Sequence, residues 1–191
     1  LQLTDKDEHV FSAVLSPDGK TAYYLAMPAE DFHKEPGKNE NGTDVHMIHT
    51  DGSGHEKLTD QDRFDMRQIS ISEDGQRLYY NGFENGIYYD IENGMEKGNS
   101  EIAAPGEVYH TVLSPDEDYL AYTKVDDKSE QGTFIYELFL KDTSSGDSER
   151  LTDFDSNVIS PVFFHRKERL AFLANNNLPV EPSQYEIMTV P

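Results

Sequence analysis

Asp and Glu are the residues of this sequence that are most suited by number to binding a cation or a basic partner. The 191 residues include 37 Asp and Glu against 16 Lys and Arg, which gives a formal net charge of −21 at pH 7. Carboxylates can attract a basic partner, or bind a cation such as calcium together with carbonyl oxygens. Many of them lie in segments rich in Pro, Gly and Asn, which are typical of loops. The candidate binding residues in these segments are Glu30, Asp31, His33, Glu35, Asp60, Asp62, Asp65, Asp126, Asp127, Asp153 and Asp155.

A second interpretation of these carboxylates remains open. Solvated loops of an acidic protein would have the same composition, and the charge would then serve solubility. No calcium-loop motif supports the first interpretation, because the segment Asp5–Glu8 lacks the Gly and the distal Glu of a helix–loop–helix site. Calcium therefore remains a candidate ligand that no sequence motif supports. No cofactor is predicted.

The histidines show no spacing typical of a metal site. His46 and His49 are three residues apart in a segment that reads as a β-strand, so their side chains should point to opposite faces. The other five histidines, His9, His33, His55, His110 and His165, are scattered along the chain. A metal site assembled from several segments is compatible with this distribution, but nothing in the spacing requires one. The sequence therefore predicts no metal ligand.

Nucleophilic catalysis has no motif in this chain either. Cysteine is absent, and no G-x-S-x-G segment occurs. The acidic charge argues against nucleic acid and against an anionic membrane surface, since both require a basic footprint. No run of about 18 apolar residues is present, so no membrane-spanning segment is expected. The first residue is Leu1 rather than Met, which fits a removed signal peptide, a lipid anchor or a preceding domain.

The segments that must position these side chains are repeated along the chain. A turn motif, SPDG, occurs at Ser16, with related copies at Ser72 and Ser114 and a divergent copy at Phe164. A second motif, LTD, accompanies it at Leu3, Leu58 and Leu151. An aromatic column follows each turn, formed by Tyr24, Tyr80, Tyr122 and Phe172, and it predicts packing between the repeats.

Each repeat contains strand-like runs rather than helical ones. In the first repeat these runs are Val10–Leu15, Thr21–Met27, Val45–Thr50 and Glu56–Thr59, with alternating apolar residues. Repeats of about 42–56 residues with four strands each are typical of the blades of a β-propeller. The fold class is therefore all-β, a β-propeller with four four-stranded blades. The approximate repeats are 1–57, 58–101, 102–150 and 151–191, in a single domain.

The combination of LTD, an apolar strand, SPDG and a strand such as LYY resembles the TolB-like, WD-type propeller repeat family of bacteria. Similar repeats occur in the propeller domains of prolyl-oligopeptidase-type peptidases. The third copy departs from the pattern with Glu117 in place of Gly, and the fourth reads FHRK from Phe164. The resemblance implies a propeller outside the cytoplasm, whether periplasmic, secreted or lipid-anchored, although a cytoplasmic location stays open.

The strand count predicts an incomplete propeller or a section of a larger one. The last repeat ends after its third strand, Tyr185–Val190, and Leu1–Thr4 is expected to be an unattached outermost strand that could complete it. Open propeller edges would also allow self-association.

A binding role for a protein or peptide partner follows from this architecture. The SPDG and DGSG turns share one end of the strands, so variable loops at the other end are expected to bind the partner. We expect a non-catalytic binding or scaffold module that uses an acidic loop face toward a basic partner. The alternative is an enzyme-associated propeller, either polysaccharide lyase-like with a composite metal site or the non-catalytic domain of a peptidase.

Overall fold

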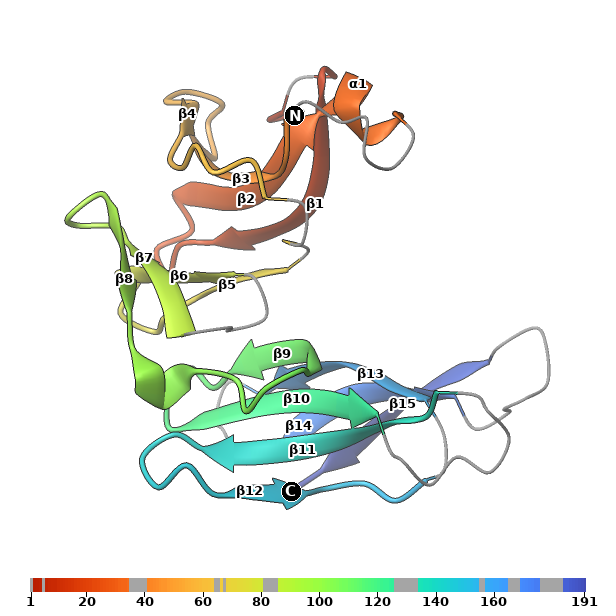
Figure 1. The fold of residues 1–191 in the computed structure, drawn as a ribbon. Helices are drawn as coiled ribbons and strands as arrows, with labels where there is room; N and C mark the ends of the chain where they lie inside the picture. The colour runs from red at the N-terminus through yellow and green to blue at the C-terminus, as the bar shows by residue number, and fades with distance from the viewer. Residues whose placement is uncertain are drawn as a thin grey trace. The chain divides into compact units, whose positions relative to one another are not determined.

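A computed structural model describes residues 2–4, 6–34, 41–63, 66, 68–80, 86–125, 134–154, 157–164, 169–175 and 184–191. These residues form four antiparallel sheets, and within each sheet the strands that are consecutive in sequence pair with one another. Figure 1 follows this order from β1 to β15. The chain thus has the all-β architecture of a propeller with four blades, as predicted.

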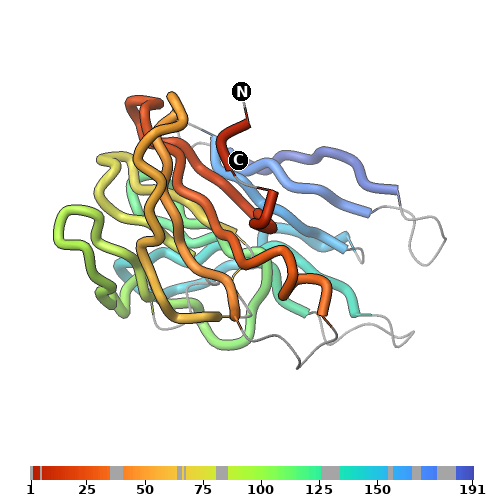
Figure 2. The backbone as a smooth tube through the Cα atoms, turned by 90° about the horizontal axis from the view of Figure 1, so that it is seen from above, coloured from red at the N-terminus to blue at the C-terminus, as the bar shows by residue number. Residues whose placement is uncertain are grey.

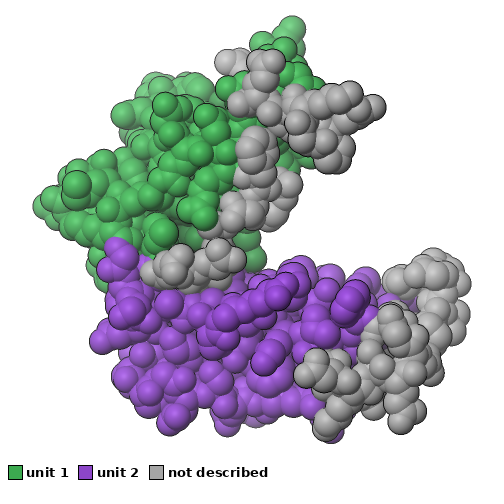
Figure 3. All heavy atoms as spheres, viewed as in Figure 1, with its two compact units in different colours: residues 1–81, 87–97 green, residues 82–86, 98–191 purple. Residues whose placement is uncertain are grey.

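Two compact units divide the chain, and each is described by itself (Figure 3). Unit 1 comprises Leu1–Asn81 and Ile87–Lys97, and unit 2 comprises Gly82–Gly86 and Gly98–Pro191. The sheets fall within the four predicted repeats, whereas the single-domain organisation stays a prediction.

Unit 1 is built on the first two sheets. The first contains β1 (Glu8–Leu15), β2 (Thr21–Pro28), β3 (Asp44–His49) and β4 (Glu56–Lys57). The second contains β5 (Ile69–Ile71), β6 (Arg77–Tyr80), β7 (Ile87–Asp90) and β8 (Met95–Gly98), whose last residue belongs to unit 2. One helical turn, α1 (Ala29–Phe32), follows β2.

Unit 2 is built on the other two sheets. The third contains β9 (Tyr109–Leu113), β10 (Tyr119–Val125), β11 (Tyr136–Asp142) and β12 (Ser148–Arg150). The fourth contains β13 (Asn157–Phe163), β14 (Leu170–Asn175) and β15 (Tyr185–Val190), which agrees with the predicted three-stranded last repeat. A short 3-10 helix, Ser100–Ile102, precedes β9. Figure 2 shows the hairpin path of the chain through these sheets. In the described parts of the chain, no helix is long and apolar enough to cross a membrane.

The core of each unit lies between its two sheets. In unit 1, Leu25 and Val45 of the first sheet pack with Leu78 and Tyr80 of the second. In unit 2, Leu138 of the third sheet packs in one cluster with residues of the fourth. The predicted aromatic column is buried throughout, because Tyr24, Tyr80, Tyr122 and Phe172 are each no more than 3% exposed. The strands β2, β6 and β10 are buried on both faces over most of their length, which places their rings in the interior.

The repeated SPDG turn closes in the same way in each sheet. The N–H of Ser16 donates to Thr21 O, and the N–H of Phe164 donates equivalently to Arg169 O in the divergent fourth copy. The first Ser hydroxyl also donates to Asp18 Oδ1 at 2.7 Å, as Ser72 and Ser114 do to their own aspartates. These side-chain bonds explain why Ser and Asp recur at this turn.

The amino-terminal segment differs from the sequence-based prediction. Leu1–Thr4 was expected to be a strand, but residues 2–4 are not strand. The side chain of Leu3 packs on the first sheet, against the cluster of Ala22, Tyr24, Ala26 and Ile48. The prediction is therefore wrong for these residues, because side-chain packing on an apolar sheet face holds the segment rather than a backbone ladder.

Candidate functional site

The loop end of the first sheet carries most of the predicted binding residues that the structure describes. β2 ends there, β3 begins there, and β4 runs back toward it, as the antiparallel order requires. The link that follows β4, residues 58–63, is attached to this end, because Thr43 and Arg63 exchange two backbone hydrogen bonds. Gly42 permits this close approach, since a Cβ at that position would lie 2.0 Å from the carbonyl carbon of Asp62.

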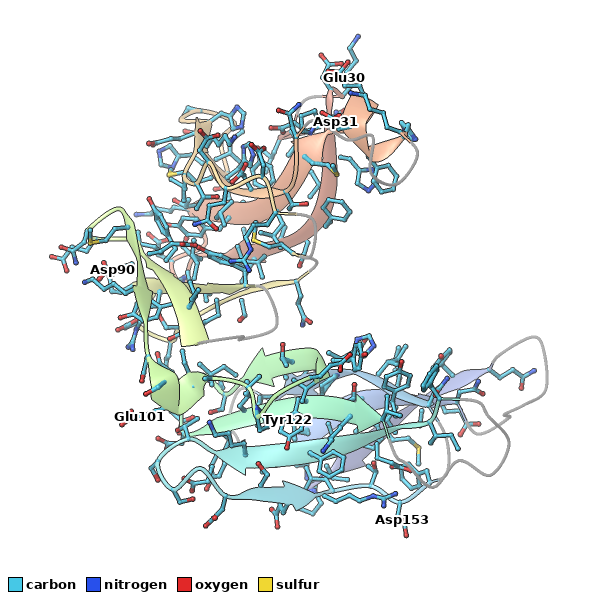
Figure 4. All side chains as sticks on the ribbon, in the orientation of Figure 1. Glu30, Asp31, Asp90, Glu101, Tyr122 and Asp153 are labelled. Atoms are coloured by element: carbon cyan, nitrogen blue, oxygen red, sulfur yellow. The ribbon has the colours of Figure 1, made fainter. Side chains whose placement is uncertain are left out.

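The helical turn α1 presents some of these residues and encloses another. Glu30 and His33 are exposed, whereas Asp31 is fully buried. Figure 4 shows Glu30 and Asp31 on this turn. The Asp31 carboxylate accepts a hydrogen bond from Asn41 Nδ2 at 2.6 Å and lies 2.7 Å from Lys34 Nζ. Asp31 therefore holds the turn to the loop that follows it.

The other candidate aspartates differ in exposure and in the groups that they contact. The Asp60 side chain is 87% exposed and lies 2.6 Å from Lys57 Nζ. Asp62 is half-buried, and its carboxylate accepts a hydrogen bond from the N–H of Gly42 at 3.1 Å. In unit 2, Asp153 is 80% exposed and pairs with Arg150 at 2.6 Å. Five further candidates lie outside the described residues, namely Glu35, Asp65, Asp126, Asp127 and Asp155.

The threonine of the LTD motif forms hydrogen bonds to the third strand of the blade. In the first blade, Thr59 Oγ1 accepts a hydrogen bond from the N–H of Val45 at 3.0 Å and donates to Asp44 Oδ1 at 2.7 Å. In the third blade, Thr152 Oγ1 accepts from the N–H of Leu138 at 2.9 Å and donates to Glu137. Each threonine thus ties the outer part of its blade to the third strand.

Acidic side chains also populate the turn end of the strands. Asp18, Asp51, Asp74, Asp90 and Asp142 each accept hydrogen bonds from side chains or N–H groups of their own turns. The strongest case is Asp90, where Lys97 and Asn93 hold the carboxyl pKa at about 2. These carboxylates belong to turn structure, and the negative charge is therefore not confined to the loop end.

Three other side chains come together on the first blade. Glu8 begins β1, His46 lies in β3, and His55 directly precedes β4. One ligand atom from each lies within 4.8 Å of the others, and among the described residues no other such group of three is found. Burial lowers the pKa of His46, so its imidazole is neutral at pH 7. His49 lies apart, with Nδ1 3.3 Å from the Thr21 hydroxyl, in accordance with the predicted opposite faces.

Sequence reasoning did not find this group. The DGSG turn does imply that β3 and β4 form a hairpin, and this hairpin is the signal that places His46 near His55. Glu8 joins them through its side chain from the far strand of the same sheet, and that contact has no sequence signal. His33, which was singled out as a candidate, stacks edge-on against Phe32 with ring centroids 5.3 Å apart.

Comparison with known proteins identifies the fold. No family model and no curated protein matches the chain. Among solved structures, TolB from Acinetobacter baumannii is 18% identical with a TM-score of 0.61, over 96% of this chain and 41% of that chain. An oligogalacturonate lyase in complex with manganese is 14% identical with a TM-score of 0.63, over 98% and 52%. A puromycin hydrolase is 17% identical with a TM-score of 0.60, over 100% and 28%.

This chain thus spans about half or less of each of these solved structures. At such low identity the likeness concerns the fold, which supports the predicted resemblance at the level of architecture. The chain has the β-propeller fold found in TolB.

Proposed function

We propose that this chain is a non-catalytic binding module that takes a basic segment of a protein or peptide partner at the loop end of the first blade. The observation that carries the proposal is the placement of Glu30, Asp60 and Asp62 at this one end of the sheet, on α1 and on the attached link. The likeness to TolB supports a propeller scaffold for such a role.

The charge balance at this end supports attraction of a basic segment. Lys57 lies 3.0 Å from Asp44 and 2.6 Å from Asp60, so two carboxylates share one ammonium group. Asp31 is compensated by Lys34, whereas Glu30 is exposed on the outside of the turn. Carboxylates placed in this way accelerate association with a basic partner more than they strengthen the final complex.

Neutralising the exposed carboxylates tests this proposal. The double variant Glu30→Gln, Asp60→Asn is compared with Glu73→Gln, Asp118→Asn, which removes the same charge from exposed residues at the turn end. The probe is a fluorescent lysine-rich peptide, measured at about 0.1 M NaCl, where the Debye length is about 10 Å. We expect affinity to fall by about threefold to tenfold in the loop-end variant alone, since exposed pairs contribute about 0.2–1 kcal/mol each. Equal loss in both variants would mean that the peptide senses only net charge.

An extracytoplasmic location is part of the same proposal. The fold likeness to TolB supports it, together with the acidic charge suited to a soluble exported protein. Fractionation of cells that express the full gene under its own promoter tests the location. Recovery in the cytoplasmic fraction would contradict it.

A further inference from the structure

We infer that Glu8, His46 and His55 form a binding site for a divalent transition-metal ion of the zinc type on the first blade. The site is distinct from the acidic loop residues of the proposed function, and it stands on different side chains.

The distances from Glu8 to the two histidines are close to those between ligands of one metal ion, and all three ligand atoms lie within 4.8 Å of one another. Glu8 Oε1 lies 3.6 Å from His46 Nδ1 and 3.4 Å from His55 Nε2. Direct N–H···O hydrogen bonds would be shorter, at roughly 2.7–3.2 Å. Tetrahedral ligands that are each about 2.0–2.1 Å from zinc lie about 3.3–3.4 Å from one another. The separations therefore leave room for an ion between the groups.

An unsatisfied buried atom points to the same position. His46 Nδ1 is buried and has no hydrogen-bond partner among the described residues. A buried polar nitrogen without a partner is costly, and a metal ion would satisfy it.

The surrounding residues hold the three groups in place. Tyr24 pairs directly with His46 across β2 and β3, and its hydroxyl donates to Glu8 Oε2 at 3.1 Å. This bond orients the carboxylate so that Oε1 faces the two imidazoles. The Tyr24 ring also stacks on His46, with centroids 5.3 Å apart. Such partners of a ligand fix its orientation and strengthen metal binding.

The composition of the site selects the class of metal. Two imidazole nitrogens and one carboxylate suit zinc and its neighbours, whereas calcium and magnesium prefer oxygen ligands throughout. The His55 side chain is 44% exposed, so an ion can enter from solvent and keep water as a further ligand. Bound metal would connect the start of β1 to the hairpin of β3 and the two-residue strand β4. It should therefore stabilise the first blade.

Calorimetric titration of the whole chain with zinc chloride tests the inference, after dialysis against EDTA. We expect one ion per chain, no competition from excess magnesium, and the visible absorption bands of tetrahedral cobalt when cobalt(II) is used instead. At a zinc concentration about 100 times the Kd, the thermal midpoint should rise by about 5 °C or more. The variants His55→Gln and Glu8→Gln should each weaken binding by about tenfold or more.

The matched control is His33→Gln, which removes an exposed histidine of the same unit. His55 is also partly exposed, so its replacement leaves the core of the sheet intact, and circular dichroism checks the fold of each variant. Absence of zinc binding to the wild-type chain would overturn the inference. Equal weakening by His33→Gln and His55→Gln would also overturn it, since this would indicate adventitious binding to surface histidines.

Discussion

The Asp44 carboxylate is almost entirely buried and connects three segments of the first blade. It accepts hydrogen bonds from Thr59 Oγ1 and from the N–H of Gln61, and it lies 3.0 Å from Lys57 Nζ. Burial by itself would raise the carboxyl pKa, but these hydrogen bonds and the ammonium group outweigh burial, so the pKa lies below its usual 3.8. The ionised form of the Asp44 carboxyl group is therefore more stable in the folded protein than in the unfolded protein.

Replacing this carboxylate should make stability depend on pH in a defined direction. Asp44→Asn should lower the free energy of unfolding at pH 7 by about 1–3 kcal/mol, because a buried charged acceptor is lost. The contribution is complete above the unfolded pKa of 3.8 and is lost as pH falls through the lower folded pKa. The difference between wild type and variant should consequently shrink below about pH 4. Urea unfolding at several pH values measures it.

Asp60→Asn provides the control for this prediction. Asp60 contacts the same Lys57, but its side chain is 87% exposed, so the change should cost less than about 1 kcal/mol. A difference between wild type and Asp44→Asn that is constant from pH 7 to pH 3 would contradict the assigned role of the carboxylate.

At the scale of the element, the turn between the first two strands forms even where its sequence departs from the repeat. The third copy has Glu117 where the first two have glycine, and Glu117 adopts a φ of 68°, close to the 69° of Gly19. The N–H of Glu117 still donates to Ser114 O at 2.9 Å, as the N–H of Gly19 does to Ser16 O. A non-glycine residue in this left-handed region is strained. The Ser114–Asp116 hydrogen bond and the bond from the Thr143 hydroxyl to Glu117 O hold the turn in this conformation.

The strain at this turn predicts a stabilising substitution. Glu117→Gly should raise stability by about 0.5–1 kcal/mol, because relief of the left-handed strain exceeds the entropy cost of glycine. For a chain of this size, the thermal midpoint should rise by about 1–4 °C, as measured by calorimetry. Gly19→Ala is the reverse experiment, since a Cβ there meets no atom within 4 Å and only the backbone conformation is penalised. A loss of stability in Glu117→Gly would show that side-chain contacts of Glu117 dominate.

At the scale of the whole molecule, the dominant electrostatic property is the net charge of −21. Carboxylates occupy both the turn end and the loop end of the strands, so their mutual repulsion is distributed over the surface. Several ion pairs, such as Lys57 with Asp60, offset it locally. Exposed pairs of this kind contribute little, whereas a large net charge destabilises the compact state.

Salt should therefore stabilise this protein. Raising NaCl from about 0.01 M to about 0.5 M shortens the Debye length from about 30 Å to a few ångströms and screens the repulsion. We expect the urea midpoint at pH 7 to increase over this range and then to level off. A decrease in the midpoint would mean that local ion pairs outweigh the repulsion between carboxylates.

The sequence by itself determined the features that depend on local chemistry. Turns such as SPDG, the alternation of apolar residues and the buried column that includes Tyr24 and Phe172 recur at short range. They predicted the propeller fold, the strands and the three-stranded last sheet. The free energies behind them come from turn formation and from burial of apolar side chains within a strand, and both depend on residues near in sequence.

Only the tertiary structure decided which distant side chains meet. It enclosed Asp31, committed Asp44 to the LTD threonine, and brought Glu8 to His46 and His55. It also placed Leu3 on the first sheet instead of in a strand. These contacts depend on strand register, on the path of loops of variable length and on the reach of single side chains. None of these is encoded in a short sequence pattern, because each is set by the packing of the whole blade.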